Sequence, residues 1–459
     1  MNFPVKMIVS TPHFERMIHM SHNDCIRKSI DLKDKNITFD YLFCEELVIK
    51  GRKSKVYHAK LSYQPEECKE CKKENTKHSI VKNGFMLSKI KWISHTRYPT
   101  YLFLRKQRFL CRQCGASFLA ESLEFEKHCF IARRVKQSVL FELTDATSFK
   151  DIAKRHAISS TTVIRTMRQA GNERRNQFKT LPETLCFDEF TSTKNKKGKY
   201  SFIYSNASSH KIIDILIDNF SRTIRDHFLR YPLKERLKVK AIVVDMNAGY
   251  FKRVKELFPN ASVVIDRFHL VQLINRALNV TRIKTMNTYR TASPSAAKDY
   301  RKLKRYWKLF LKESNDLDYQ TYHYHRLFKK VITETEIMDY LLSLNSQLKE
   351  TYQLYQDLLY CSKKNDYEGF KDLILMTKKH ELSPSMETSI LTLKKHLPRI
   401  KNTFQSTLSN GSLEGSINKI KLIKRIAYGY RNFYNYRDRI LLSFSDKKIG
   451  NENAMVFAA

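Results

Sequence analysis

The sequence predicts a multidomain α+β protein, and the residue patterns of three regions support this. Residues 56–129 hold two Cys-x-x-Cys pairs among short strand-like runs, which predicts a metal-binding β module. Residues 130–180 have the apolar spacing of three and four that is typical of amphipathic helices. From residue 181, short runs rich in β-branched residues alternate with helical segments and then give way to a long helical stretch.

The composition indicates a polyanionic partner, most simply nucleic acid. The 459 residues include 84 Lys and Arg against 46 Asp and Glu, so the formal net charge is +38. A charge excess of this size is the electrostatic footprint of nucleic-acid binding. A Lys-rich bias from an AT-rich genome is the alternative, but it would not make the charge balance so one-sided.

The N-terminal region and the cysteines indicate a reducing, cytoplasmic location. The first residues, MNFPVKMIVSTPHF, lack the apolar core of a signal peptide, and no apolar run approaches the roughly 20 residues that span a bilayer. We therefore expect no membrane partner, and we expect the nine cysteines to be metal ligands or buried thiols. Met20 is an alternative start to Met1, which would make residues 1–19 an upstream extension.

The two Cys-x-x-Cys pairs predict one structural Zn²⁺ ion. Each pair can present two thiolates to one ion, and tetrahedral Zn²⁺ takes four such ligands. The separation of the pairs exceeds the roughly 15–20 residues of common zinc modules, but the strands between them can form a hairpin that closes the gap. Two unrelated thiol pairs are the alternative. The expected ligands are Cys68, Cys71, Cys111 and Cys114.

Residues 148–169, SFKDIAKRHAISSTTVIRTMRQ, predict a helix-turn-helix. The turn is expected at residues 157–159, and the hydroxyl of Ser159 or Ser160 can cap the second helix. An ordinary helical hairpin is the alternative. On the DNA-reading interpretation, the second helix meets base edges. The side chains expected to contact DNA there are those of Arg155, Ser160, Thr161, Thr162 and Arg165.

Four acidic residues are placed where carboxylates can bind a metal. Asp188, Asp245 and Asp266 follow apolar runs that read as strands, and Glu414 opens a late helix. Carboxylates at strand ends can converge at one rim of an α/β sheet, and together they can hold two Mg²⁺ ions for phosphodiester chemistry. Solvated residues or helix caps are the alternative. The chain has no Gly-rich phosphate loop, which argues against a nucleotide triphosphatase.

The helix that begins near Glu414 carries a strongly basic face. Its sequence, SNGSLEGSINKIKLIKRIAYGYRN, places positive charges at helical spacing after the single acid. A phosphate backbone running along this face would place Glu414 near the scissile bond. The basic residues expected to contact DNA here are Lys419, Lys421, Lys424, Arg425 and Arg431.

These motifs together resemble the ISL3 (ISL-three) family of bacterial insertion-sequence transposases. The matching stretches are the paired cysteines, KDIAKRHAISSTTVIR, LCFDEF, VVDMNAGY, VIDRFHLVQLINRAL and SNGSLEGSINKIKLIKRIAYGYRN. The resemblance implies an RNase H-like α/β catalytic core interrupted by an all-α insertion. It also implies catalytic roles for Asp188, Asp245 and Glu414. Asp266 also ends a strand and competes with Asp245 as the second ligand; we favour Asp245, with Asp266 and His269 in support.

The resemblance further implies a DDE transposase that uses two Mg²⁺ (or Mn²⁺) ions. Its DNA partners would be double-stranded terminal inverted repeats and target DNA, on which it would act as a homo-oligomer in the bacterial nucleoid. A non-catalytic DNA-binding regulator is one alternative. A nuclease on the same core, which cuts without joining, is another.

The expected domain boundaries are drawn from the resemblance and from the points where the residue pattern changes between strand-like and helical. In chain order they are an N-terminal segment (1–55), the zinc-binding module (56–129), the helix-turn-helix domain (130–180), the first part of the core (181–266), the helical insertion (267–408), the core helix with Glu414 (409–445) and a tail (446–459).

Overall fold

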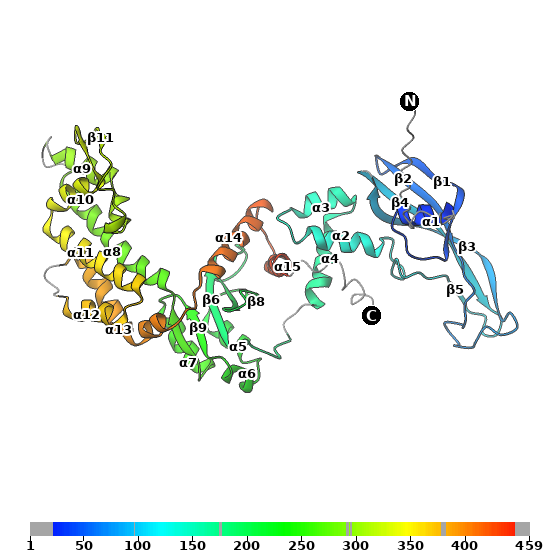
Figure 1. The fold of residues 1–459 in the computed structure, drawn as a ribbon. Helices are drawn as coiled ribbons and strands as arrows, with labels where there is room; N and C mark the ends of the chain where they lie inside the picture. The colour runs from blue at the N-terminus through cyan, green and yellow to red at the C-terminus, as the bar shows by residue number, and fades with distance from the viewer. Residues whose placement is uncertain are drawn as a thin grey trace, which may run out of the picture. The chain divides into compact units, whose positions relative to one another are not determined.

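The computed structural model describes residues 22–95, 97–173, 177–290, 293, 296–377 and 382–445 (Figure 1). The alternative starts at Met1 and Met20 and the expected tail at 446–459 lie outside these residues. The chain divides into two compact units. Unit 1 comprises Met1–Arg174, Ile423–Tyr430 and Tyr434–Ala459, and unit 2 comprises Arg175–Leu422 and Arg431–Phe433.

A five-stranded sheet forms the first part of unit 1. The order is β1-β2-β4-β3, with β5 paired to β4. β1 and β2 are antiparallel and joined at Lys50 and Gly51, which both have positive φ, as a tight hairpin turn requires. The sheet therefore begins well before residue 56, where we expected the β module to start. Its elements are α1 (His22–Ser29), β1 (Ile37–Ile49), β2 (Arg52–Leu61), β3 (Ile80–His95), β4 (Tyr98–Cys111) and β5 (Ser117–Leu119).

A small helical bundle completes unit 1. It contains α2 (Arg133–Glu142), α3 (Phe149–His156) and α4 (Ser160–Glu173), and α15 (Phe433–Ser443) returns to it from the end of the chain. Leu442 of α15 belongs to the bundle's buried apolar cluster. The buried guanidinium of Arg439 donates hydrogen bonds to the carbonyl oxygens of Leu143, Asp145 and Thr147. The segment 409–445, which we expected to be one core helix, is thus divided between α14 and α15.

Unit 2 is built on a second five-stranded sheet of mixed direction. The order is β10-β9-β6-β7-β8. β6, β7 and β8 are antiparallel neighbours, whereas β9 and β10 run parallel to β6. The strands are β6 (Thr184–Phe190), β7 (Ser201–Asn206), β8 (Ile212–Leu216), β9 (Ala241–Val244) and β10 (Ser262–Ile265), and the helices between them are α5 (Ser221–Phe228), α6 (Leu233–Leu237) and α7 (Ala248–Leu257).

Aromatic side chains hold the helices against this sheet. Phe187 of β6 stacks on Phe228 of α5 with ring centroids 5.4 Å apart, and it meets Phe202 of β7 edge to face at 5.0 Å. All three rings are buried. Large rings bury the most apolar surface per residue and pack in defined geometries. This packing fixes β6, and with it the position of Asp188.

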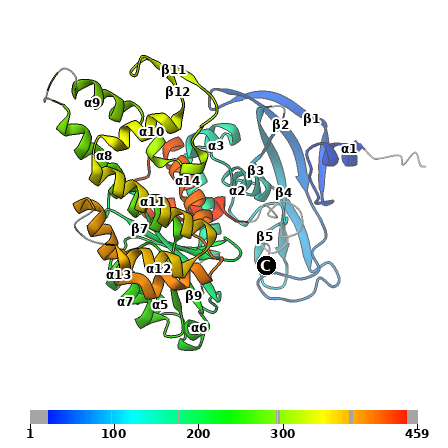
Figure 2. The same cartoon turned by 60° about the vertical axis from the view of Figure 1, so that its left-hand side comes forward.

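A long helical region follows β10, as the sequence predicted. α8, α11 and α13 lie side by side in it (Figure 2), and a small hairpin, β11–β12, interrupts the helices. Thr403 of α13 bonds through its hydroxyl to the backbone of Ile265, which ties the region to the edge strand β10. The elements are α8 (Arg267–Thr288), α9 (Ala296–Arg305), β11 (His323–His325), β12 (Lys330–Ile332), α10 (Glu334–Ser343), α11 (Ser346–Lys364), α12 (Tyr367–Met376), α13 (Pro384–Gln405) and α14 (Gly411–Ile426).

Within the described ranges, we find no helix with the length and apolar character needed to cross a membrane.

Candidate catalytic site and metal centre

Four cysteines in unit 1 converge on one point, as their spacing predicted. The sulfur atoms of Cys68, Cys71, Cys111 and Cys114 all lie within 4.8 Å of one another. The Cys68–Cys114 and Cys71–Cys111 Sγ distances are 3.7 and 3.9 Å. A tetrahedral Zn²⁺ with Zn–S bonds of about 2.3 Å needs sulfurs roughly 3.8 Å apart. The four thiols therefore fit a structural metal such as zinc.

Two matching turns and one hairpin bring these cysteines together. Lys72 and Gly115 have φ of 58° and 70°, and each donates its N–H to the carbonyl oxygen of the first cysteine of its pair, at 2.9 Å. Cys111 ends β4 opposite Ile80 of β3. The β3–β4 hairpin thus accounts for the unusually long separation between the two pairs.

α3 and α4, joined by a turn, lie where the helix-turn-helix was predicted. Ala157, with φ of 50°, ends α3, and the Ser159 hydroxyl caps α4 by accepting the Thr162 N–H at 3.1 Å. Ser160, Thr161 and Arg165 are exposed, as the DNA-reading interpretation requires. Two further side chains assigned to DNA have partners within the protein: the Thr162 and Ser159 hydroxyls are 2.9 Å apart, and Arg155 pairs with Glu142 at 2.9 Å.

The three strand-end aspartates lie at one edge of the sheet in unit 2. Asp188 is near the end of β6, and Asp245 and Asp266 directly follow β9 and β10. These strands are parallel neighbours, so their carboxyl ends share an edge. We refer to these three residues, with His269 in the first turn of α8, as the acid edge.

Close contacts connect the members of the acid edge. His269 Nε2 lies 2.6 Å from Asp245 Oδ1. Asn410, which is buried, donates its side-chain N–H to Asp188 Oδ2 at 3.2 Å and its backbone N–H to Asp266 Oδ1 at 3.5 Å. Asn410 thereby joins the start of α14 to two of the three aspartates.

Three groups of the acid edge, the carboxyl groups of Asp188 and Asp266 and the ring of His269, have raised pKa values. Burial, followed by repulsion from Asp245, raises the pKa of Asp188 to about 7. Burial also raises the pKa of Asp266. The pairing with Asp245 raises the pKa of His269, despite the opposing effect of its burial. The site therefore favours added positive charge, whether protons or a bound cation.

Two buried oxygens at this edge suit a metal. Asn410 Oδ1 is buried without a hydrogen-bond partner, and Asp245 Oδ1 is buried with only His269 Nε2 close to it, at 2.6 Å. A buried oxygen without a donor is costly. Mg²⁺ and Mn²⁺ prefer oxygen ligands, so the donor set at the acid edge suits these ions.

Glu414 is not joined to the aspartates in the same way. Glu414 is exposed on the first turn of α14, and its backbone N–H donates to the carbonyl oxygen of Asn410 at 3.0 Å. Among the residues that the structure describes, the cysteines form the one group of three or more metal-binding side chains within 4.8 Å. The carboxylate oxygens of Asp188, Asp245 and Glu414 therefore do not all lie within 4.8 Å of one another.

Three polar residues that were not predicted as site residues, Asn410, Asn219 and Tyr250, contact carboxylates at the end of β6. Asn410 bonds to Asp188, and the other two bond to Glu189. Glu189, on the opposite face of β6 from Asp188, accepts hydrogen bonds from the Tyr250 hydroxyl and from Asn219 Nδ2, the latter at 2.9 Å. An Asn placed directly before a helix that opens with an acid was the available signal for Asn410. Tyr250 ends the stretch VVDMNAGY, which resembles the family, but its contact with Glu189 was not predicted, and no motif marked Asn219.

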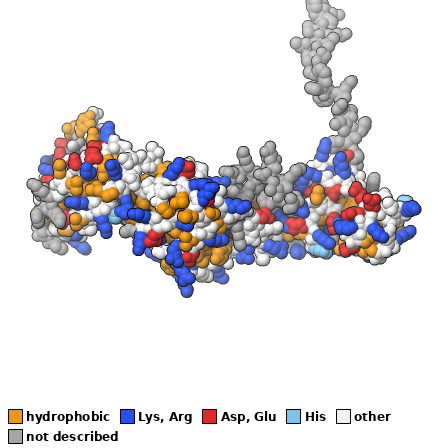
Figure 3. Space-filling model, turned by 90° about the horizontal axis from the view of Figure 1, so that it is seen from below, with side chains coloured by type: hydrophobic (Ala, Val, Ile, Leu, Met, Phe, Trp, Pro, Cys, Tyr) orange, Lys and Arg blue, Asp and Glu red, His pale blue; other side chains and the backbone are white. Residues whose placement is uncertain are grey.

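The basic residues around α14 are accessible. Lys419, Lys421, Arg425 and Arg431 are exposed, and Lys424 is half-buried. Figure 3 shows Lys and Arg side chains spread over the described surface seen in that view. This distribution agrees with the large excess of positive charge in the sequence.

Comparison with known families identifies the class of protein, which is a transposase. A family model described as "Transposase", for the DDE transposases of ISL3 type, matches residues 185–440. The match covers more than half of the chain, from the first strand of the unit 2 sheet into α15. The protein therefore belongs to the ISL3 family of transposases.

Two curated relatives are similar to parts of the chain. The transposase for insertion sequence element IS1001 of Bordetella parapertussis is 23% identical over 341 residues, 73% of this chain and 79% of that protein. A protein of Lactococcus lactis subsp. lactis named "ATP-dependent protease" is 45% identical over 127 residues. That match covers 27% of this chain, and the chain spans only 40% of that relative's length.

Proposed function

We propose that this protein is an active DNA transposase that binds the terminal inverted repeats of an insertion sequence and catalyses metal-dependent strand cleavage and strand transfer. Membership of the ISL3 family supports the reaction class. The observation that carries the chemistry is the convergence of Asp188, Asp245 and Asp266, on three parallel strands, at one edge of the sheet.

The topology of unit 2 supports an RNase H-like catalytic core. Three antiparallel strands are followed by a fourth and fifth that run parallel to the first, in the order β8-β7-β6-β9-β10. The first and fourth strands are adjacent and carry Asp188 and Asp245 at the same edge. The helical region between β10 and α14 is then the insertion that separates these aspartates from Glu414.

Asp188, Asp245 and Glu414 are the proposed ligands of two Mg²⁺ (or Mn²⁺) ions. Bound there, such ions would lower the pKa of a water or 3′ hydroxyl and stabilise the leaving oxygen of the phosphodiester. Asn410 fixes the first turn of α14 against Asp188 and Asp266. Glu414 lies one helical turn after Asn410 on α14, which supports its proposed role as the third ligand.

His269 and Asp266 are proposed to support the ligands. Pairing with Asp245 raises the pKa of His269, and the ring lies 2.6 Å from Asp245 Oδ1. It can therefore orient the Asp245 carboxylate. Asp266 accepts the backbone N–H of Asn410, which positions the start of α14.

Unit 1 is the proposed DNA-end recognition unit. The exposed face of α4, with Thr161 and Arg165, is proposed to read base edges, and the zinc module is proposed to stiffen the same unit. The exposed basic residues Lys421, Arg425 and Arg431 are proposed to contact backbone phosphates. Because a transposase must hold both ends of its element together, we propose that it acts as a homo-oligomer on DNA.

A paired-end strand-transfer assay tests this function. Purified protein is mixed with a donor carrying two terminal repeats, a target plasmid and Mg²⁺ or Mn²⁺, and cleaved and joined products are counted separately. We expect both products with the natural chain and neither with Asp188→Asn. The control is Asp316→Asn, which changes an exposed acid outside the acid edge. Cleavage without joining would instead indicate a nuclease, and end binding without either product would indicate a regulator.

A further inference from the structure

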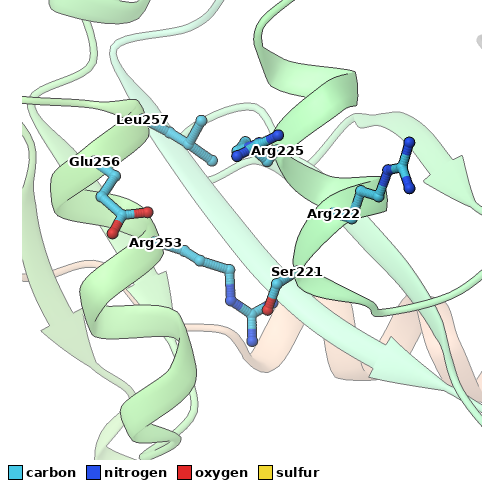
Figure 4. A pocket seen from close by; sticks show the side chains of 6 residues that line it. All are labelled: Ser221, Arg222, Arg225, Arg253, Glu256 and Leu257. Atoms are coloured by element: carbon cyan, nitrogen blue, oxygen red, sulfur yellow. The ribbon is translucent and has the colours of Figure 1, made fainter.

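A basic pocket lies between α5 and α7 of unit 2, outside the proposed ligands. Its volume is about 360 Å³, and Figure 4 shows the guanidinium of Arg253 beside Ser221, with Arg225 and Leu257 across the pocket from them. The residues that line it are Ser221, Arg222, Arg225, Arg253, Glu256 and Leu257.

The charge of this lining is predominantly positive. Three arginines face one glutamate. Arg222 and Arg225 share a single exposed acid, Asp226, at 3.6 Å each, and Glu256 lies 3.9 Å from Lys252 on its own helix. Exposed ion pairs at such distances are weak, so they leave the arginines able to bind another anion.

Arg253, which lines the pocket, is held in place by its neighbours and keeps one N–H without an acceptor. Its guanidinium lies over the Tyr250 ring at 4.7 Å, and its Nε donates to the carbonyl oxygen of Gly249 at 2.9 Å. Its Nη1 is buried and has no hydrogen-bond partner. A Cβ at residue 249 would lie 2.9 Å from Arg253 Nη2, so glycine leaves room for the guanidinium. A buried donor without an acceptor is costly, which an anion in the pocket would correct.

Both walls of the pocket are tied to the residue after Asp188. Tyr250, on which Arg253 stacks, donates its hydroxyl to Glu189, and Asn219, two residues before Ser221, donates to the other Glu189 oxygen at 2.9 Å. Anything bound between α5 and α7 is thereby held in a fixed relation to β6. The first turn of α5 also has no side-chain cap, so its N–H groups add to the positive potential.

We propose that this pocket binds one backbone phosphate of the DNA strand that passes the acid edge. This proposal rests on the proposed function for the identity of the ligand. Guanidinium groups bind phosphate oxygens through paired hydrogen bonds, and Arg253 presents a fixed, unpaired N–H for this purpose. The contact positions the strand for cleavage and carries no sequence preference.

A phosphate-neutralisation scan tests the proposal. Terminal-repeat duplexes are made with an uncharged methylphosphonate at one position at a time, and the affinity of each is measured. With the natural chain, neutralising the phosphate that enters the pocket is expected to weaken binding roughly 5- to 20-fold, the loss of one charge-assisted contact. With Arg225→Gln/Arg253→Gln, unmodified DNA binds correspondingly weaker, and sensitivity at that one position disappears.

Matched variants keep the outcome interpretable. Lys255→Gln removes one positive charge from α7 outside the pocket lining and is expected to retain the natural scan profile. Arg225→Gln alone changes an exposed side chain and is expected to reduce the sensitivity at the same position, so the result does not depend on replacing the packed Arg253.

Two results would overturn the proposal. The first is an unchanged scan profile in both arginine variants; if Asp188→Asn still abolishes cleavage, the pocket assignment fails while the proposed function stands. The second concerns the source of the phosphate. If inorganic phosphate binds the natural chain but not the double variant, while the two chains have the same DNA scan, the pocket is a free-anion site and not a DNA site.

Discussion

The cysteine centre and the acid edge are both candidate metal sites, but they differ in how completely the folded chain assembles them. The four sulfurs of the cysteine centre already lie within 4.8 Å of one another. At the acid edge, the charge of Asp245 raises the pKa of Asp188, whereas Glu414 stays exposed at the start of α14. A structural metal site can be closed by local turns. A catalytic site that must admit a DNA strand keeps open positions for substrate.

The cysteine centre gives the largest expected effect. Cys68→Ser removes one thiolate, and we expect the zinc content to fall from one ion per chain to near zero, because zinc bound by four cysteines contributes on the order of 10 kcal/mol to folding. Metal analysis after gel filtration measures this. Cys25→Ser, which alters an exposed thiol outside the cluster, should keep its zinc; if Cys68→Ser also keeps its zinc, the four-cysteine centre is wrong.

The acid edge should bind metal in competition with protons. The pKa of Asp188 is raised to about 7, so below that pH a proton must leave before Mn²⁺ can bind. The apparent Mn²⁺ affinity should therefore rise about tenfold per pH unit between pH 5 and 7 and level off above that. Electron spin resonance titration of the zinc-loaded protein measures free Mn²⁺ directly.

A charge-removing variant checks the cause of this pH dependence. Repulsion from Asp245 contributes to the raised pKa of Asp188. Asp245→Asn should therefore move the pH-dependent range downward, in addition to weakening binding, while Asp316→Asn should leave it in place. Affinity that does not change between pH 5 and 7 in the natural chain would contradict proton competition at Asp188.

Asn410 should have a smaller, but measurable, role as a positioning residue. Asn410→Ala removes a hydrogen bond to the Asp188 carboxylate, worth about 1.5–3 kcal/mol. We expect cleavage to slow roughly tenfold to hundredfold, with end binding retained. Comparison of cleavage at low and saturating Mn²⁺ tells positioning from general damage: a positioning defect should partly recover at high Mn²⁺. Asn315→Ala, at an exposed site, is the control. If Asn410→Ala cleaves within twofold of the natural rate, Asn410 does not position the Asp188 carboxylate.

The same comparison explains what the sequence could predict. The Cys-x-x-Cys spacing identifies all four zinc ligands from the sequence. Only the β3–β4 hairpin, which brings the two pairs together, had to be learned from the structure. Asp188, Asp245 and Asp266 were predictable because each directly follows or ends an apolar strand run. The residues that contact this region were not predictable from the sequence, because they are brought there only by tertiary packing. Asn410 bonds to Asp188 and Tyr250 bonds to Glu189, each from a distant part of the chain.

The end of the chain shows a second limit of sequence reasoning. The basic and aromatic residues after Glu414 read as one continuous helix face, but the chain turns at Tyr428 and Gly429, which both have positive φ. α15 then packs on the bundle of unit 1 through Arg439 and Leu442. Periodicity alone does not show which of two cores an amphipathic helix will join.

The central claim is that Glu414 completes the catalytic set that Asp188 and Asp245 begin, and the cleavage rate of Glu414→Gln tests it most directly. We predict a fall of roughly 10²- to 10³-fold or more, several kcal/mol of lost metal-dependent stabilisation, with end binding within about threefold of natural. The matched control, Glu350→Gln on the exposed face of α11, should cleave normally. Cleavage by Glu414→Gln within threefold of the natural rate, under conditions where Asp188→Asn is inactive, would contradict the claim.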